Sequence, residues 1–151
     1  PGFEMKDIIK LHDRKFKIMI PAEKIDEAVS AVAQRINEDY GDKETPLFVG
    51  VLNGSFMFMS DLIKKIEFNN ELPFVKLASY EESIEYMICD LKAQKPASLE
   101  VCTLFFKPGS YRKQIPIKYR AMEIGNEFIV GYGLDYDQLG RSLKDIYVVT
   151  E

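Results

Sequence analysis

Apolar and polar positions follow two kinds of spacing along this chain. In the first kind, apolar residues recur every three or four positions, which is the pattern of a helix with one buried face. This spacing predicts three helices. Their apolar positions are Ile25, Val29, Val32 and Ile36 in a helix from Pro21 to about Tyr40, then Phe56, Met59, Leu62, Ile63 and Ile66, and finally Ile84, Met87, Ile88 and Leu91.

The second kind of spacing is a short apolar run, which is typical of a buried strand. A weaker, alternating run at 15–20 predicts a short edge strand, and residues 1–10 are interpreted as a lead-in. Ile8, Ile9 and Leu11 are expected to dock on the body. Because strands and helices then alternate, we expect an α/β fold with a parallel sheet and right-handed crossovers. The runs that predict further strands lie at 48–52, 74–80, 99–106, 121–124, 128–130 and 146–149.

The break at Asn53-Gly54-Ser55 stands between a buried strand and a helix. Ligands bind at the carboxyl end of strands in an open α/β sheet, and the free N–H groups of a helix N-terminus attract anions. The alternative is an ordinary turn in which Ser55 caps the helix. On this stretch alone, the ordinary turn is the favoured interpretation.

Length and composition fit one domain over residues 1–151. The chain is 46% hydrophobic and 29% charged, the profile of a soluble globular protein with a substantial core. A net charge of -4 argues against a nucleic-acid-binding surface. No apolar run reaches the ~18 residues of a membrane span, and the first residues carry no secretory signal pattern. We therefore expect a cytoplasmic protein that binds neither nucleic acid nor membrane.

Three residues that could carry special chemistry are interpreted as ordinary. Cys89 and Cys102 lie in apolar surroundings without metal-ligand spacing, so reduced, buried thiols are expected. His12 is the only histidine, which excludes a site with several histidine ligands. It stands between charged residues and is expected on the surface.

Four stretches, taken in order, resemble one enzyme family. They are 51–57 (VLNGSFM), 75–80 (VKLASY), 101–107 (VCTLFFK) and 127–136 (EFIVGYGLDY), with Arg141 just beyond. The chain resembles the hypoxanthine (hypoxanthine-guanine) phosphoribosyltransferases of the type I phosphoribosyltransferase family, most closely the bacterial type, over nearly all of 18–149. The resemblance implies a mainly parallel, twisted sheet flanked by helices, with a small hood formed by the terminal segments.

The resemblance also implies an activity in purine salvage. A 6-oxopurine base attacks phosphoribosyl pyrophosphate (PRPP), so that hypoxanthine gives IMP, guanine gives GMP, and pyrophosphate leaves with Mg²⁺. The transition state resembles an oxocarbenium ion, whose separating charge the enzyme must stabilise. Family members usually pair, so a homodimer or homotetramer is expected. Preference among hypoxanthine, guanine and xanthine stays open.

By resemblance, Leu52, Asn53, Gly54 and Ser55 form the pyrophosphate loop. The family holds the bond after the leucine in cis, which turns backbone N–H groups toward the pyrophosphate. A non-proline cis bond costs ~3–4 kcal/mol and persists only where its surroundings enforce it. Family members often have lysine or arginine at the position of Asn53, so this chain lacks that cation but keeps the backbone donors.

The base pocket is assigned by the same resemblance. Lys107 is expected as a catalytic residue that donates to the exocyclic oxygen and helps N7 lose its proton. Phe128 would stack on the purine ring, and Ile129 would offer backbone groups to the base edge. The alternatives are a solvated lysine before a Pro-Gly turn and an ordinary core phenylalanine.

Three further roles follow from the resemblance. Asp135 would contact the purine site and hold Mg²⁺, and Arg141 would grip the pyrophosphate as a second catalytic residue. Ser79 and Tyr80 would begin a mobile lid that excludes water. For Asp135 and Arg141, the alternatives are a loop cap and a surface ion pair.

The family's defining motif has no match in the sequence. It consists of two adjacent acids, two apolar residues and Asp-Thr-Gly; it binds the ribose hydroxyls and the 5′-phosphate and supplies the proposed general base. Only its tail is recognised, in Glu82-Ser83-Ile84, where Ser83 would bind phosphate. Either the chain is a catalytically dead deletion variant, or the printed sequence joins two segments across missing residues.

We favour missing residues, because losing a central strand would open the core. A break is therefore predicted between Tyr80 and Ile84, with about twenty or more residues absent, enough for a lid and a strand. The alternative function is a non-catalytic regulator with this fold that binds a nucleotide. The missing motif is the only feature that favours it.

Overall fold

The computed structural model describes residues 7–42, 45–52, 54–76, 80–111 and 114–150. Within these ranges the chain forms three helices and eight strands. The helices are α1 (Ala22–Tyr40), α2 (Phe56–Ile63) and α3 (Tyr80–Ala93). The strands are β1 (Ile8–Leu11), β2 (Arg14–Ile20), β3 (Gly50–Leu52), β4 (Phe74–Lys76), β5 (Cys102–Phe106), β6 (Tyr119–Glu123), β7 (Ile129–Val130) and β8 (Ile146–Val149).

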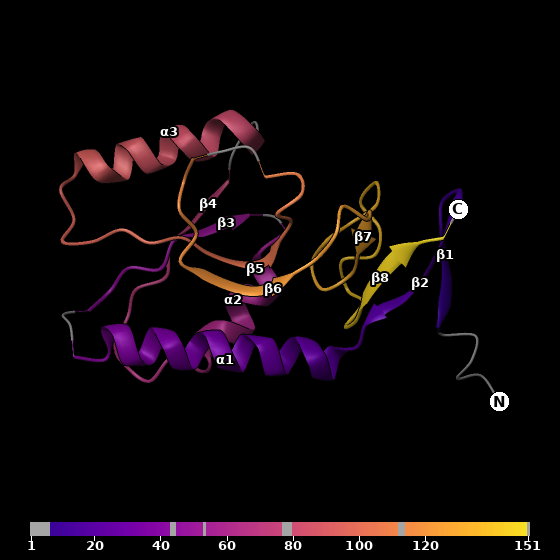
Figure 1. Cartoon of the computed structure of the whole chain (residues 1–151), viewed down its shortest axis with the longest axis horizontal. Helices are drawn as coiled ribbons and strands as arrows, with labels where there is room; N and C mark the ends of the chain where they lie inside the picture. The colour runs from indigo at the N-terminus through magenta and orange to yellow at the C-terminus, as the bar shows by residue number, and fades with distance from the viewer. Residues whose placement is uncertain (1–6, 43–44, 53, 77–79, 112–113, 151) are drawn as a thin grey trace.

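The two ends of the chain form one antiparallel sheet, which we call the terminal sheet. Its strand order is β1-β2-β8-β7, and Figure 1 shows it at one end of the molecule. The prediction that 15–20 is an edge strand is wrong, because β2 lies between β1 and β8. The lead-in in fact contains β1, which a tight turn folds back onto β2. Ile8 is 58% exposed rather than docked, whereas Ile9 and Leu11 pack beside buried Phe16.

The remaining strands form two separate parallel pairs, β3–β4 and β5–β6. Parallel pairing and the alternation of strands with helices are confirmed. A single continuous parallel sheet is not found among the described residues, because β3 and β5 each pair with one strand only. Strand β4 covers Phe74–Lys76 of the strand predicted at 74–80. That prediction was wrong at Tyr80, which is helical, and residues 77–79 lie outside the described part.

The core lies against α1, which runs along one side of the parallel pairs, with α3 on the other side in the view of Figure 1. The predicted stripe of α1 is confirmed, since all four of its apolar residues are buried, together with Ala33. Pro21 and Gly41 bound this helix, which agrees with the predicted range from Pro21 to about Tyr40. Helix α2 ends at Ile63, earlier than predicted, and Phe56 is 39% exposed rather than in the core.

Helix α3 runs without interruption through the predicted break. It begins at Tyr80, four residues before the helix predicted from the apolar spacing, and includes Glu81, Glu82 and Ser83. A helix formed by the residues that the chain contains does not test whether further residues stand between them in the protein. The missing segment therefore stays a prediction.

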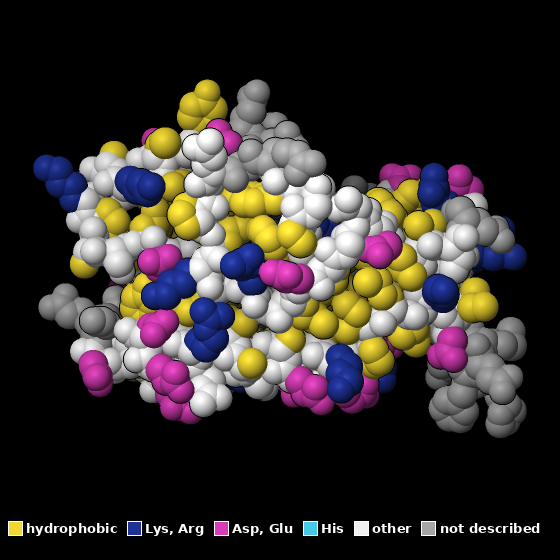
Figure 2. Space-filling view, in the orientation of Figure 1, with side chains coloured by type: hydrophobic (Ala, Val, Ile, Leu, Met, Phe, Trp, Pro, Cys, Tyr) yellow, Lys and Arg dark blue, Asp and Glu magenta, His cyan; other side chains and the backbone are white. Residues whose placement is uncertain are grey.

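Both cysteines are free, but their surroundings differ. The prediction that Cys89 is buried is wrong, because its side chain is exposed on α3. Burial raises the pKa of the Cys102 thiol to about 12, so this thiol stays protonated at neutral pH. No helix in the described ranges is long and apolar enough to cross a membrane. Figure 2 shows acidic and basic side chains interspersed on the face it presents.

Candidate active site

Lys107 follows directly after β5, at the carboxyl end of that strand. The carbonyl oxygen of Lys107 accepts hydrogen bonds from the N–H groups of Ser110 and Tyr111, which close the expected Pro-Gly turn. Its Nζ donates to the carbonyl oxygen of Glu127 over 3.2 Å. An ammonium group has three donors, so this bond leaves donors for a ligand. The structure therefore places the Lys107 cation beside the residue that precedes Phe128.

Phe128 is 44% exposed, which excludes the interpretation as an ordinary core side chain. Its ring centroid lies 5.7 Å from that of Tyr136 in an edge-on arrangement, and 6.3 Å from that of Phe16. An aromatic ring that is supported on one side and accessible elsewhere can offer a face to a planar ligand. The exposure and support of Phe128 are thus compatible with stacking on a purine.

Ile129 lies on β7, the edge strand of the terminal sheet. The N–H of Val149 donates to the carbonyl oxygen of Phe128 over 3.1 Å, and Ile129 stands opposite Val148. Hydrogen-bonded and non-bonded pairs alternate along an antiparallel ladder. The N–H and C=O groups of Ile129 therefore point away from β8, toward the open edge. They can pair there with the edge of a bound base.

The loop that follows β7 lies against the turn that precedes α2. Gly133 has φ +95°, and a Cβ at this position would lie only 2.7 Å from the carbonyl oxygen of Gly54. Any side chain at residue 133 would thus collide with the turn. A Cβ on Gly54 would in turn meet Leu134 at 3.1 Å. This close approach brings the predicted pyrophosphate loop next to the loop that carries Asp135 and Arg141.

Asp135 and Arg141 bind to each other and to their own loop. One carboxylate oxygen of Asp135 accepts the N–H of Gln138 at 2.7 Å, and the other lies 3.2 Å from Nη2 of Arg141. Nη1 of Arg141 donates to the carbonyl oxygen of Gly133 at 2.8 Å. The loop cap and the ion pair considered as alternatives are therefore both present. Because each side chain keeps about a quarter of its surface exposed, a ligand can still reach them.

The turn before α2 keeps backbone donors available. Ser55 occupies the N-cap position but makes no side-chain cap; its hydroxyl donates instead to the carbonyl oxygen of Val51, at 2.5 Å. The first N–H groups of a helix have no partner within the helix, and without a side-chain cap they can face an anion. Asn53, and with it the predicted cis bond after Leu52, lies outside the described residues.

Tyr132 makes a contact with Asp61 that the sequence did not predict. It is buried at φ 48°, and its hydroxyl donates to Asp61 on α2, whose other carboxylate oxygen lies 3.0 Å from Nζ of Lys64. Burial alone would raise the pKa of Asp61, but the bonds from Tyr132 and Lys64 outweigh it and hold the pKa below its usual value. This bond anchors the loop on α2 and keeps Gly133 against the turn.

The described residues provide few ligands for a metal ion by themselves. They contain no group of three or more His, Cys, Asp or Glu side chains placed to hold one. Mg²⁺ is commonly bound through one or two carboxylates together with substrate phosphates. Asp135, with its partly exposed carboxylate, fits that mode of binding.

Two of the predicted residues lie in α3, Tyr80 and Ser83, and their side chains are not described. Ser79 lies outside the described ranges. The structure thus brings together Lys107, Phe128 and Ile129 as one group. A second group joins Gly54 and Ser55 to Asp135 and Arg141 across Gly133.

Comparison with known proteins finds relatives that are all named as phosphoribosyltransferases of hypoxanthine or of hypoxanthine and guanine. No family model matches the chain. The chain is 30% identical to the hypoxanthine phosphoribosyltransferase of Escherichia coli strain K12, covering 86% of this chain and 93% of that protein. It is 32% identical to the hypoxanthine-guanine phosphoribosyltransferase of Staphylococcus epidermidis, covering 90% and 94% of the two.

Solved structures resemble most of the chain. A hypoxanthine-guanine phosphoribosyltransferase from Bacillus anthracis superposes with a TM-score of 0.83 at 26% identity, covering 89% of this chain and 98% of that one. The hypoxanthine phosphoribosyltransferase of Trypanosoma cruzi, in complex with the product IMP, gives a TM-score of 0.81 at 26% identity and covers 93% of each. These neighbours confirm the α/β fold predicted from the sequence.

The alignment with the Escherichia coli relative also measures what the chain lacks. It extends over 165 positions, although it covers only 86% of this chain, which has 151 residues. The relative therefore carries residues that have no counterpart in the printed sequence.

Proposed function

Because the chain belongs to the family of hypoxanthine and hypoxanthine-guanine phosphoribosyltransferases, we infer that it is an enzyme of purine salvage. It transfers the phosphoribosyl group of PRPP to hypoxanthine, and also to guanine, giving IMP or GMP and pyrophosphate. The observation that carries this conclusion is 30% identity over 93% of a relative with that activity in its name. The related structure with bound IMP supports a nucleotide product.

The base is proposed to bind at the group formed by Lys107, Phe128 and Ile129. Its ring would stack on the exposed face of Phe128, and its edge would pair with the free backbone groups of Ile129. Nζ of Lys107 would donate to the exocyclic oxygen, which stabilises the negative charge that develops there as N7 loses its proton. The 3.2 Å bond from Lys107 to Glu127 supports this placement, because it ties the ammonium to the residue before Phe128.

The pyrophosphate is proposed to bind at the second group, at Leu52, Asn53, Gly54 and Ser55. Backbone N–H groups at the start of α2 would donate to its oxygens, and Arg141 would leave Asp135 to make a bidentate contact. Phosphoribosyltransferases generally work with a divalent metal. Mg²⁺ held by Asp135 and phosphate oxygens would supply positive charge to the leaving group.

The lid and the phosphate-binding motif are proposed to belong to a segment missing between Tyr80 and Ile84. Ser79 and Tyr80 would begin the lid, and Ser83 would end the phosphate site. The separation of the two parallel pairs supports this, because one more strand between β3 and β5 would join them into one sheet. The longer alignment with the relative agrees.

The regulator alternative is not favoured, because the relatives are named as enzymes. We further propose that the protein acts in the cytoplasm as a homodimer or homotetramer on small-molecule substrates. Single-domain organisation over 1–151 is part of the same proposal.

The proposed activity is tested by measuring pyrophosphate release from PRPP with hypoxanthine, guanine, xanthine or adenine offered separately. We expect turnover with hypoxanthine and guanine and little with adenine, whose exocyclic amino group cannot accept a hydrogen bond from Lys107. The gene is sequenced in parallel, so that protein with every encoded residue is assayed. Binding of nucleotides without turnover by that complete protein would support the regulator instead.

A further inference from the structure

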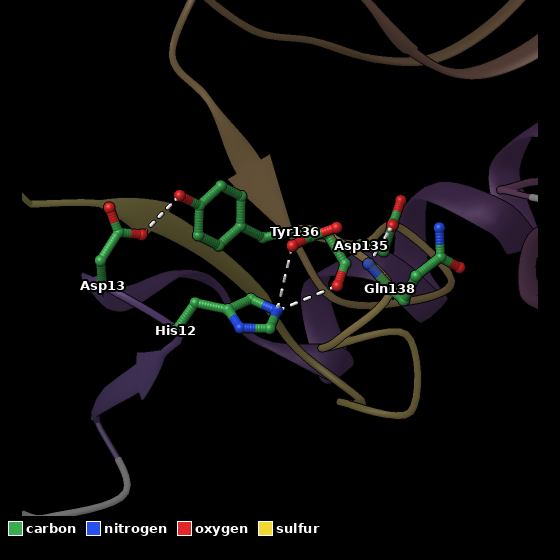
Figure 3. Close-up of polar contacts among 6 residues, drawn as sticks. His12, Asp13, Asp135, Tyr136 and Gln138 are labelled. Carbon is green, nitrogen blue, oxygen red and sulfur yellow. Dashed lines mark hydrogen bonds and ion pairs between the residues drawn. The ribbon is translucent and has the colours of Figure 1, made fainter.

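The tip of the β1–β2 hairpin is tied to the loop that carries Asp135. His12 and Asp13 form the turn between β1 and β2. The hydroxyl of Tyr136 donates to Oδ1 of Asp13 at 2.6 Å, and Nε2 of His12 donates to the carbonyl oxygen of Asp137 at 2.9 Å. Figure 3 shows the contact between Tyr136 and Asp13, with His12 close to the loop that carries Tyr136 and Gln138. These contacts join positions more than 120 residues apart in the sequence.

Both partners in this contact have unusual backbones. His12 has φ 52°, and Asp137 and Gln138 have φ 45° and 75°. Residues other than glycine adopt this left-handed region at a cost and keep it where their surroundings hold it. The hydrogen bond between His12 and Asp137 therefore joins two turns that each need external support.

The Tyr136 ring connects this contact to the proposed base site. It packs edge-on against Phe128 at 5.7 Å and lies 5.8 Å from buried Phe16. Arg14, the first residue after the hairpin turn, lies over the same ring at 5.9 Å. Phe128 thus packs against a ring whose hydroxyl is held by Asp13.

We propose that the hairpin tip is a positioning device for the base site, in which Asp13 fixes Tyr136 and Tyr136 supports Phe128. This rests on the proposed binding of the base at Phe128. Tyr136 and Asp13 are positioning residues and touch no reacting atom. Without their hydrogen bond the Tyr136 hydroxyl is no longer held, and the ring that supports Phe128 keeps only its contacts with neighbouring side chains. The pyrophosphate group has further supports in the bond from Tyr132 to Asp61 and in those of Arg141 to its own loop, so PRPP binding should change less.

The test compares KM for hypoxanthine with KM for PRPP in the complete enzyme. Tyr136→Phe keeps the ring but removes the hydroxyl, and it should raise KM for hypoxanthine about three- to tenfold. Asp13→Ala should have the same effect, whereas Asp13→Asn keeps an acceptor oxygen and should restore KM. The double variant Tyr136→Phe with Asp13→Ala should be no worse than either single change, because both break one bond. KM for PRPP and kcat should stay within about twofold.

Tyr119→Phe is the matched control, because it removes a tyrosine–aspartate hydrogen bond to Asp39 on α1 at 2.5 Å, away from this loop. It should leave KM for hypoxanthine unchanged. An unchanged KM in Tyr136→Phe, or an equal rise in both KM values, would overturn the inference. Phe128→Ala separates the two proposals. If it leaves KM for hypoxanthine unchanged, the base site itself is wrong; if it raises that KM while Tyr136→Phe does not, only the positioning role fails.

Discussion

The terminal sheet and the parallel strand pairs differ in how many strands are hydrogen-bonded into one sheet. The terminal sheet is one continuous ladder of four strands, and it presents Phe128 and Ile129 at its edge. The parallel strands form two pairs that do not join within the described residues. In the proposed site, the base group therefore lies at the edge of a continuous sheet, whereas the pyrophosphate group lies beside strand pairs that remain separate in the described residues.

The two regions would respond differently to the loss of the proposed segment for a physical reason. The antiparallel strands β1 and β2 join through a tight turn, and β8 is added from the other end of the chain. Parallel strands need crossover connections and a neighbour on each side to be well buried. Removing one central parallel strand leaves two pairs with open edges, while the terminal sheet keeps its ladder.

Supplying the missing segment should have the largest effect. We expect the gene to encode about twenty or more further residues between Tyr80 and Ile84. Protein with the 151 printed residues should release pyrophosphate at least about a hundredfold more slowly than the complete protein, since it lacks a general base. Gene sequencing and the intact mass, above 17.4 kDa for the complete protein, check the first point, and the PRPP assay checks the second.

The control for this prediction is base binding, because the intact region should keep it. Both proteins should bind IMP through the base group, although the shortened one binds its phosphate poorly. A gene that encodes Tyr80 to Ile84 without insertion, together with full activity, would contradict the comparison.

Lys107→Ala is expected to have the next largest effect. Lys107 follows a parallel strand but donates to Glu127 beside the terminal sheet, so it bridges the two regions. Loss of its donor should lower kcat/KM for hypoxanthine about 10²- to 10³-fold, the usual effect of losing a donor to developing charge. Lys118→Ala, which removes a cation near Asp39 on α1, is the control and should change little. Full retained activity in Lys107→Ala would exclude the assignment.

Whether a feature of the fold or of the site could be predicted from the sequence depends on how far apart in the sequence the contacting residues are. The stripe of α1 was predicted because helical periodicity over many residues is a local signal. The proximity of Lys107 to Phe128 was expected through the family resemblance alone. Strand β1 was missed, because a four-residue run with one exposed isoleucine has no clear period.

The anchoring contacts could not be predicted from spacing. Tyr132 and Asp61 are 71 positions apart, and His12 and Asp137 are 125 apart. Periodicity places a residue on a face of its own element and does not identify its partner on another. The sequence interpretation of His12 as a surface residue is confirmed, but its contact with the loop was found only in the structure.

Arg141→Ala tests the phosphate side at a moderate scale. If Arg141 grips the pyrophosphate, KM for PRPP should rise about tenfold or more while KM for hypoxanthine changes less. Arg141 also holds Gly133 and Asp135, so part of the loss could come from the loop itself. Arg141→Lys keeps the charge without the bidentate fork and should give an intermediate KM for PRPP. Equal rises in both KM values would assign Arg141 a structural role.

Tyr132→Phe should have the smallest effect, and it acts where the two regions meet. Tyr132 follows the terminal sheet, and its hydroxyl bonds to Asp61 on α2. Removing the hydroxyl should lower the free energy of unfolding by about 1 kcal/mol at neutral pH, the usual net value of such a bond at a partly exposed carboxylate. Urea denaturation of both proteins measures the difference.

The difference in the free energy of unfolding between the two proteins should become smaller at low pH and at high pH. The pKa of Asp61 lies below its ordinary value of 3.8, so the bond stabilises the fold above that pH and is lost as the pH falls through the lowered pKa. Burial and the bond to Asp61 raise the pKa of Tyr132 above 10.0, so above that pH the unfolded chain ionises first and the fold loses stability. Tyr132→Phe has no phenol to ionise and no bond to lose. The gap between the two proteins should therefore be widest between these limits and narrow on both sides, and a gap that stays constant with pH would show that Tyr132 contributes by packing alone.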